Sequence, residues 1–359
     1  MCSVRWYNAS AHYALTLALS LRKSGLNVIL FGLPGSPFLS KAKEYRFNLI
    51  ENIGLMNQGI VQYIINLYKF RKLIIKKKID LLNPYISRDH FFAYLSLFGK
   101  NKNIVRTRTD SKIPKSNIFN KIFYRISSGN YIVSSKYMIS HITAMGLPEN
   151  RITVIPLELN YKDYSTYKSK KNLKYELGIN KVKKVVSFVG RLDRIKGVEY
   201  FIKSFSYLKN KNKFHYIVSG EEINLFIDEL KDLASSLKIN SISFIGKADD
   251  ARDILKITDI GVVPSIGSEA ICRIGLEMLA FGIPIVGSNI NSIPELINEY
   301  GGRVVSPGSP LEIANALEYL AVPENYRNIQ NQIKQAFQKK QPDQFVLSHV
   351  DIFLKELNK

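Results

Sequence analysis

The sequence has little cysteine and no long apolar run. Its 359 residues contain 2 cysteines, Cys2 and Cys272, which lie far apart and do not have the spacing of a disulfide framework or a zinc site. No stretch reaches the ~18 consecutive apolar residues that a membrane-spanning helix needs. The opening residues MCSVRWYNAS lack the apolar segment of a secretory signal. These features predict a cytosolic protein with reduced thiols and no metal site.

Acidic residues are scarce mainly in the first half of the chain. Residues 1–159 contain 23 lysines and arginines against 7 acids, a balance of +16, whereas residues 160–359 contain 28 against 23, a balance of +5. A domain this basic attracts a polyanion, such as a nucleic acid, an anionic membrane or a phosphorylated glycolipid. The alternative is a lysine-rich solvated surface without a dedicated partner.

Several nucleotide and nucleic-acid motifs are also missing. No G-x-G-x-x-G follows a strand-like run and no P-loop signature occurs, which disfavours a nicotinamide-dependent dehydrogenase. Zinc spacing, an RNA-binding sheet signature and a basic helix with heptads are absent as well. Only the positive charge therefore supports the hypothesis of a nucleic-acid-binding protein.

Short apolar runs alternate with helical patterns along the chain, which is typical of open α/β sheets. In the first half, ASAHYALTLALSLRKSG predicts a helix, LNVILF a buried strand and IDLLN another strand, with helices near 57–78, 88–99, 116–128 and 135–145. A second alternation runs from KKVVSFVG to GRVVSP. The polar segment LNYKDYSTYKSKKNLKYELGIN between them is predicted to be a linker. Two doubly wound parallel-sheet domains are therefore expected.

The first predicted helix follows a very short opening segment. Only MCSV precedes the loop RWYNAS and this helix, although a doubly wound domain normally opens on a central strand. Met1 is therefore expected to be the tail of a strand that is missing or truncated here. An in-frame upstream extension of roughly four to six apolar residues would support this hypothesis, and an upstream stop codon would contradict it.

The segment VVSFVGRLDRIKGVEYFIKSF has the pattern of a strand, a loop and a helix. The strand ends at Gly190, Arg191 and Lys196 flank the loop, and the helix begins near Gly197. Ligands of open α/β sheets bind beyond the carboxyl ends of the strands. Guanidinium and ammonium groups at that edge suit a diphosphate. The alternative is a pair of exposed basic residues in a loop.

The segment SEAICRIGLEMLAFGIPIVG contains two glutamates, Glu269 and Glu277. If the segment is helical throughout, they lie ~12 Å apart along the helix axis. This separation is too wide for the carboxylate pair of typical glycoside hydrolysis. A helix N-terminus between them is suited to hold a phosphate. We therefore predict a nucleotide-sugar site, with hydroxyl groups at the two glutamates and the diphosphate at Arg191 and Lys196.

VGRLDRIKG followed by SEAICRIGLE resembles the donor-site signature, Glu-x7-Glu, of retaining glycosyltransferase family 4, and the lipopolysaccharide or glycolipid-type members in particular. The segments VSSKYMISHITAMGLPENRITVIP and EMLAFGIPIVGSNINSIPELI are similar to the family as well. The resemblance implies a GT-B fold, two Rossmann-like domains facing across a cleft. We expect an acceptor domain over residues 1–160, completed by a C-terminal helix at 342–359, and a donor domain over residues 161–341.

The resemblance also implies the roles of single residues. Arg191 and Lys196 would contact the diphosphate, Glu277 the ribose and Glu269 the donor sugar, so that Glu269, Arg191 and Lys196 form the catalytic set. Transfer would be a same-face displacement in which the leaving phosphate helps to deprotonate the acceptor. No metal or other cofactor is expected. The remaining donor-binding candidates, which would offer backbone groups to the phosphates, are Gly190, Ala270, Ile271 and Cys272.

Parts of the first half depart from the family pattern. RWYNASA lacks the paired glycines usual in the first loop, and Asp80-Leu-Leu-Asn83-Pro84-Tyr85 replaces the common Asp-x-x-His-x-His. His90 is a candidate for a position near the donor sugar, or else a packed helix residue. The basic run YKFRKLIIKKKID fits a membrane surface or, alternatively, the end of a packed helix. Candidates for contact with an anionic acceptor are Arg88, Arg106 and Arg108.

These observations predict a retaining glycosyltransferase that moves a sugar from a nucleoside-diphosphate sugar, with UDP-sugars expected, to a lipid-linked saccharide or lipopolysaccharide-type acceptor. The expected location is cytoplasmic, peripheral to the inner face of the membrane. The expected partners are the nucleotide-sugar, an anionic glycolipid or oligosaccharide acceptor and an anionic membrane, without a nucleic acid. Two alternatives stay open: a catalytically inactive GT-B partner of another transferase, and a basic nucleic-acid-binding protein.

Overall fold

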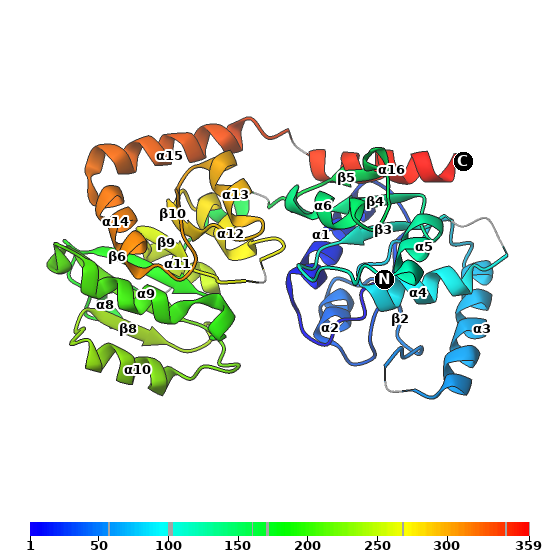
Figure 1. The fold of residues 1–359 in the computed structure, drawn as a ribbon, viewed down its shortest axis with the longest axis horizontal. Helices are drawn as coiled ribbons and strands as arrows, with labels where there is room; N and C mark the ends of the chain where they lie inside the picture. Colours follow the sequence, from blue (N-terminus) through cyan, green and yellow to red (C-terminus); the bar gives the residue numbers. More distant parts are fainter. Residues whose placement is uncertain are drawn as a thin grey trace. The chain divides into compact units, whose positions relative to one another are not determined.

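The structure is a computed structural model that describes residues 1–56, 58–99, 103–159, 161–169, 172–267, 269–341 and 343–358 (Figure 1). The chain divides into two compact units. Unit 1 comprises Met1–Leu157 and Pro342–Lys359, and unit 2 comprises Glu158–Gln341. Every strand pair in the described residues is parallel, and helices connect the strands, so each unit has the architecture of an open α/β sheet.

Unit 1 begins and ends with helices that pack against each other. Its elements are α1 (Ala9–Lys23), β1 (Ile29–Phe31), α2 (Pro37–Glu44), β2 (Asn48–Ile50), α3 (Ile60–Lys76), α4 (Ser87–Ser96), β3 (Val105–Arg108), α5 (Ile118–Ile126), β4 (Asn130–Val133), α6 (Tyr137–Thr143), β5 (Ile152–Val154) and α16 (Gln344–Leu357). α16, from the end of the chain, lies against α1. The hydroxyl of Tyr13 on α1 bonds to the Ile155 carbonyl and to the ring of His349 on α16.

The helix α1 has clear start and stop signals. The side chain of Asn8 accepts a hydrogen bond from the Ala11 amide at 3.1 Å, which caps the first turn. Arg22 and Lys23 lie in the last turn, where cations complement the helix dipole. Gly25 follows with a φ of +83°, so the chain can reverse into β1.

In the part of unit 1 that the structure describes, the strands form two short parallel sheets. β1 pairs with β2, and β3, β4 and β5 form the other sheet in that order. Single bridges extend both sheets toward each other: Cys2 pairs with Gly32 beside β1, and Leu82 pairs with Ile104 beside β3. Residues 79–83, which we predicted as a strand, therefore contribute one bridge at Leu82 and no longer ladder.

The described strands of unit 2 form a six-stranded sheet. Its elements are α7 (Tyr161–Ser165), α8 (Leu173–Glu176), β6 (Lys184–Val189), the 3-10 turn η2 (Arg194–Lys196), α9 (Val198–Ser204), β7 (Phe214–Ser219), α10 (Ile227–Ser236), β8 (Ile242–Ile245), α11 (Ala251–Ile257), β9 (Ile260–Val263), α12 (Arg273–Ala280), β10 (Ile285–Ser288), α13 (Ile293–Tyr300), β11 (Arg303–Val305), α14 (Pro310–Ala321) and α15 (Pro323–Gln338), with further 3-10 turns at Phe205–Tyr207 and Lys211–Lys213. Among the described residues of unit 1, Glu149–Arg151 form a 3-10 turn. Figure 1 shows helices on both faces of this sheet.

The strand order in unit 2 is β11-β10-β9-β6-β7-β8. The chain starts in the centre at β6, builds outward to β8, and then returns to the other side of β6 with β9. The order therefore reverses between β6 and β9, which is the topological switch point of a Rossmann-like sheet. The strands are short, continuous apolar runs because both faces of a parallel sheet are covered by helices.

The segment that we predicted to be a linker carries two short helices, α7 and α8. α7 packs against α12, and the rings of Tyr164 and Tyr167 contact Phe281. Tyr164 and Tyr167 thus pack against Phe281, although the composition around them indicates only a polar surface. None of the helices in the described part of the chain combines the length and the apolar character needed to cross a membrane.

Candidate donor site in unit 2

The candidate site lies at the carboxyl ends of β6 and β9. These two strands pair with each other, and the loops that follow them carry the basic and acidic residues predicted from the sequence. In an open α/β sheet, the crevice outside the strand ends at the switch point is the position where ligands bind. The topology of unit 2 therefore places the two predicted motifs side by side.

Close backbone contacts hold the two loops together. Gly197 has a φ of +71°, and a Cβ atom there would lie 2.0 Å from the Pro264 carbonyl oxygen, so only glycine fits. The amide of Ile266 donates to the Ile195 carbonyl at 2.9 Å. The end of η2 is thus fixed against the loop that leads from β9 to Glu269.

Lys196 and Glu269 form the central ion pair of the site. The ammonium group of Lys196 contacts Oε1 of Glu269, and the hydroxyl of Ser265 donates to the same oxygen at 2.8 Å. Only 8% of Glu269 is exposed. The hydroxyl of Ser292 donates to the backbone carbonyl of Glu269 at 2.8 Å. These bonds hold a carboxylate and a cation in one geometry, which is the preorganisation that charge stabilisation requires.

Arg191 lies in the same loop but has a different partner. Its guanidinium is 3.7 Å from the Asp193 carboxylate, and its side chain is 51% exposed. The preceding Gly190 donates its amide to the Ser219 carbonyl at 3.0 Å. The structure therefore brings Lys196 and Glu269 together and leaves Arg191 at the open edge of the loop, where it can reach a soluble anion.

The segment directly after Glu269 is not helical. The separation of ~12 Å between Glu269 and Glu277, which assumed a helix throughout, therefore does not apply. Ala270 and Ile271 are buried in the loop, and Cys272 has a φ of +47° before α12 begins at Arg273. The carboxylates are therefore not separated by a continuous helix. Ser268 lies outside the described residues. The predicted helix N-terminus between the glutamates is present at Cys272 and Arg273.

Glu277 is the second glutamate of the motif and lies on α12. It is 7% exposed, and its Oε1 is 3.6 Å from Nε of Arg273, one helical turn earlier. Burial raises the pKa of Glu277 above its ordinary value, and Arg273 opposes this effect. Tyr164 on α7 lowers the pKa of Glu277, which opposes the effect of burial, and burial raises the pKa of Tyr164 itself.

The arginines predicted to contact an acceptor lie in unit 1. Arg88 and Arg108 already donate hydrogen bonds to other residues of this unit. Arg88 donates to the Ser3 carbonyl at 2.6 Å. Arg108 donates to the Tyr124 hydroxyl at 2.8 Å and to Asp110 at 3.1 Å. Contact of Arg88 or Arg108 with an acceptor remains a prediction.

His90 and Arg106 are core residues of unit 1, each with 1% exposure. The ring of His90 lies between Phe123 and Tyr131, with centroid distances of 4.9 and 5.9 Å. Burial and the nearby Arg106 hold the pKa of His90 well below its usual range, so the imidazole is neutral. This placement agrees with the packed-helix alternative for His90, and contact with a sugar or acceptor remains a prediction for both residues.

Three residues that support the two glutamates were not identified from the sequence. Ser265 and Ser292 position Glu269, and Tyr164 acts on the pKa of Glu277. Ser265 had a detectable signal, because it lies two residues after the buried strand β9, at the edge where ligands bind. Tyr164 had none, since it lies in the lysine-rich segment far from α12 in sequence.

Comparisons with known proteins identify the family. The family models Glycosyl transferases group 1 and Glycosyltransferase Family 4 match residues 169–339 and 10–157. An uncharacterised glycosyltransferase of Methanocaldococcus jannaschii is 31% identical over 279 residues, which are 75% of this chain and 67% of the relative. A second one from the same organism is 26% identical over 215 residues, 57% of this chain and 54% of the relative. The chain thus spans about half the length of the second relative.

Solved structures show the same fold. The crystal structure of Anabaena HepE in complex with UDP has a TM-score of 0.84 at 16% identity, and the match covers 99% of this chain and 98% of that one. The predicted fold of two Rossmann-like domains is confirmed, as is the prediction of a transferase enzyme. The chain belongs to the GT-B glycosyltransferases of the family 4 type.

Proposed function

We propose that the chain is a retaining glycosyltransferase that moves a sugar from a UDP-sugar to a lipid-linked saccharide or lipopolysaccharide-type acceptor at the cytoplasmic face of a membrane. The observation that carries this proposal is the Lys196–Glu269 pair at the switch point between β6 and β9. The choice of UDP is supported by HepE, which has the same fold and was solved with UDP. We expect no metal or other cofactor.

In the proposed reaction, the bond between the anomeric carbon and the β-phosphate oxygen breaks while a bond to the acceptor hydroxyl oxygen forms on the same face. The proton of the acceptor hydroxyl passes to the leaving β-phosphate oxygen, so UDP carries this proton away. The leaving diphosphate gains negative charge, and the ammonium of Lys196 and the guanidinium of Arg191 stabilise that charge. Arg191 reaches the diphosphate from the exposed edge of its loop.

The glutamates bind hydroxyl groups in this proposal. One oxygen of Glu269 already contacts the ammonium of Lys196 and accepts a hydrogen bond from Ser265. These contacts fix the carboxylate in place, which supports a role of Glu269 as an acceptor of hydrogen bonds from sugar hydroxyls rather than as a nucleophile. Glu277 accepts from the ribose, and the backbone around Ala270, Ile271 and Cys272 lies near the phosphates, before the N-terminus of α12. Gly190 leaves space for the nucleotide, because a Cβ atom there would have only Phe188 nearby, at 3.6 Å.

A thermal-shift panel of UDP-, GDP-, ADP- and CMP-sugars tests the donor assignment. A ligand at 100 times its Kd adds ~2.7 kcal/mol to stability, which raises Tm by several degrees in a protein of this size. We expect the shift with UDP-sugars, and a smaller one in Glu277→Ala. A shift with another nucleotide class alone would correct the base. The absence of any shift would favour the inactive-partner alternative.

The acceptor part of the proposal is supported by an apolar face on α5. Ile118, Phe119, Ile122 and Ile126 are all more than half exposed. Residues four apart lie on one side of a helix, so Ile118, Ile122 and Ile126 form a stripe that faces solvent, while Tyr124 points into the core. An apolar helix face directed outward marks an interaction surface rather than a packing surface.

Basic residues surround this apolar face. Lys112 and Lys115 are exposed just before α5, and Arg125 is exposed on it. The helix thus combines apolar side chains with cations, in a half of the chain whose balance is +16. This combination suits the interface of an anionic bilayer, where apolar side chains insert and cations contact lipid headgroups. The helix α3, which contains much of the basic run predicted from the sequence, exposes Lys72 and Lys76 and packs toward α4.

We expect Phe119→Ser combined with Ile122→Ser to weaken binding to vesicles that contain phosphatidylglycerol by about tenfold or more, because each buried apolar side chain contributes ~1.5–3 kcal/mol. Co-sedimentation with vesicles measures the effect. The matched control replaces Tyr175 and Val182, two exposed apolar residues of unit 2, with serine. Equal binding by both double variants would contradict a membrane role for α5.

A further inference from the structure

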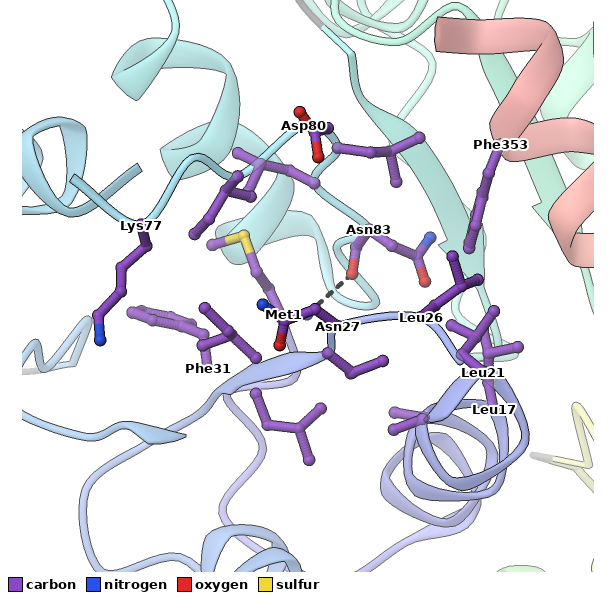
Figure 2. A pocket seen from close by; sticks show the side chains of 18 of the residues that line it. Met1, Leu17, Leu21, Leu26, Asn27, Phe31, Lys77, Asp80, Asn83 and Phe353 are labelled. Atoms are coloured by element: carbon purple, nitrogen blue, oxygen red, sulfur yellow. Dashed lines mark hydrogen bonds between the residues drawn. The ribbon is translucent and has the colours of Figure 1, made fainter. Parts of the chain in front are cut away.

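Met1 and Cys2 lie between two segments of unit 1. On one side, the amide of Cys2 donates to the carbonyl of Phe31, the last residue of β1, at 2.9 Å. On the other side, the amino group of Met1 donates to the Asn83 carbonyl at 2.8 Å, which is the dashed bond beside the cavity of about 300 Å³ in Figure 2. The two residues therefore join β1 to the segment that contains Asn83.

The strand order of unit 1 reverses at this position. From Cys2 the chain builds outward through β1 to β2, and it then returns to the other side of Cys2 near Asn83 and continues outward through β3. Ligands of an open α/β sheet bind at such a switch point, outside the carboxyl ends of the strands. Residues 5–7, which follow Cys2 in the chain, therefore lie at the ligand-binding edge of unit 1, as Glu269 does in unit 2.

The loop at this edge is anchored on both sides. Before it, the amide of Ser3 donates to the Asp89 carboxylate at 2.7 Å, and the carbonyl of Ser3 accepts from Arg88 at 2.6 Å. After it, the side chain of Asn8 caps the first turn of α1. The backbone is thus fixed directly before and after residues 5–7, so the fold itself determines which of their side chains face solvent.

Trp6 lies in the middle of this loop and is 75% exposed. Its indole therefore does little to stabilise the fold, although tryptophan is among the side chains with the largest apolar area to bury. Arg5 is exposed beside it. On the other side, the ammonium of the exposed Lys41 lies 4.3 Å from the ring centroid of Tyr7. A flat apolar surface thus has a cation on each side of it in the loop.

We propose that Trp6 is the platform on which a sugar ring of the acceptor stacks, and that this acceptor is an anionic saccharide whose charge is paired by Arg5 and Lys41. The inference rests on the proposed function, because it takes the acceptor to be a saccharide, and it names the residue that binds it. The face of a pyranose ring carries C–H groups, so a ring laid flat on the indole covers apolar area while its hydroxyl groups stay in water.

A sugar fits this surface better than a bilayer does. Trp6 is a single flat ring on an anchored loop at a switch point, where small ligands bind. Insertion into a bilayer uses a longer apolar face, such as the stripe on α5. The neighbouring cations favour a ring that carries phosphate or carboxylate over a neutral one.

The test follows the fluorescence of Trp6 in the full chain. The sequence contains 1 tryptophan, so fluorescence excited beyond the absorption of tyrosine reports this residue alone. The probe is the phosphorylated core oligosaccharide of a lipopolysaccharide from which the acyl chains have been removed. We expect a saturable blue shift, because stacking removes water from the indole. A blue shift with phosphatidylglycerol vesicles and none with the oligosaccharide would overturn the proposal and assign Trp6 to a membrane.

Variants test whether the indole contributes to affinity. Trp6→Ala is expected to weaken binding of the oligosaccharide ~10-fold in isothermal titration, and Trp6→Phe less, because phenylalanine keeps a smaller ring. Both variants should keep the wild-type Tm, since the side chain is exposed. The matched control is Tyr45→Ala: Tyr45 is 47% exposed in the same unit, but it lies between α2 and β2, at the amino ends of the strands. Undiminished binding by Trp6→Ala, an equal loss in Tyr45→Ala, or no binding by the wild type overturns the proposal.

Removal of the phosphates from the oligosaccharide tests the charge. The neutral form is expected to bind ~10-fold more weakly and still to shift the fluorescence of Trp6 at saturation. Equal affinity for both forms would overturn the anionic class of the acceptor. The thermal shift with UDP-sugars, measured separately, distinguishes this proposal from the donor assignment: a preserved response of Trp6 without any nucleotide shift would contradict the transfer reaction but support the saccharide site.

Discussion

Replacing Lys196 with alanine is expected to lower kcat/KM for sugar transfer by ~10²–10³-fold, with most of the loss in kcat. The ammonium of Lys196 is fixed by Glu269 at the edge of the sheet where the diphosphate is proposed to leave. A fixed cation stabilises developing charge without reorganising during the reaction, so its contribution is larger in the transition state than in the bound substrate. Steady-state kinetics with a UDP-sugar donor measure the loss.

Part of the loss of kcat/KM in Lys196→Ala is expected to come from destabilisation of the fold, and this part must be separated from the catalytic effect. Removal of the ammonium leaves the Glu269 carboxylate, which is nearly buried, without its counter-charge, so Lys196→Ala is expected to lower Tm as well. Lys196→Arg keeps the charge but changes its shape, and we expect intermediate kcat with Tm near that of the wild type. If Lys196→Arg restored Tm but kcat remained at the alanine level, the position of the ammonium rather than its charge would be decisive.

Arg194 provides the matched control for Lys196. It lies two residues earlier in the same turn, but its side chain is 52% exposed and pairs with Glu199 at 2.9 Å and Glu229 at 2.7 Å. Exposed ion pairs of this kind contribute roughly 0–1 kcal/mol to stability. Arg194→Ala is therefore expected to leave kcat/KM nearly unchanged. Comparable losses in both variants would show that general positive charge, and not the Lys196–Glu269 geometry, supports the reaction.

The strands of unit 2, and the position of the candidate residues after β6 and β9, were predictable from the sequence for one reason. Parallel strands covered on both faces appear as short continuous apolar runs, and the residue after each run lies at the ligand-binding edge. This rule located Gly190 after β6 and the loop with Glu269 after β9. The rule does not depend on any contact between distant residues, so it can be applied to the sequence alone.

The contacts within the site were not predictable, because they depend on backbone conformation and on distant segments. The positive φ of Cys272 delays the start of α12 until Arg273, whereas the apolar pattern alone indicates an earlier helix. Tyr164 reaches Glu277 from a segment whose lysine-rich composition is typical of a linker. His90 had two interpretations in the sequence, and its packing against Phe123, which agrees with the packed-helix one, depends on a residue that is distant in the sequence.

Glu277→Gln is expected to weaken binding of the nucleotide-sugar by ~10–100-fold. A hydrogen bond to a charged group contributes roughly 1.5–3 kcal/mol, and the amide of glutamine keeps the shape of the side chain but loses the charge that the proposed ribose hydroxyls would contact. Isothermal titration with UDP measures the change. An unaltered Kd would remove Glu277 from the donor site.

The same substitution is expected to stabilise the free protein, with a dependence on pH that identifies its cause. Burial raises the pKa of Glu277 in the folded state, so above the ordinary glutamate value of about 4.3 the folded chain holds this proton more tightly than the unfolded chain. The wild type therefore loses stability as the pH rises through this range, and the glutamine variant does not. The variant's Tm should exceed that of the wild type at pH 8, and the difference should shrink toward pH 4.

Glu312 is the control with the opposite sign. The backbone amide of Ser306 donates to its carboxylate at 2.7 Å and lowers the pKa of Glu312, so the ionised form contributes stability at neutral pH that is lost on acidification. Glu312→Gln should therefore lower Tm at pH 8 and have less effect toward pH 4. Opposite pH profiles for the two variants would tie the gain in Glu277→Gln to the burial of a charge. A glutamate kept nearly buried at a cost in stability is what a binding site requires and a purely structural helix does not.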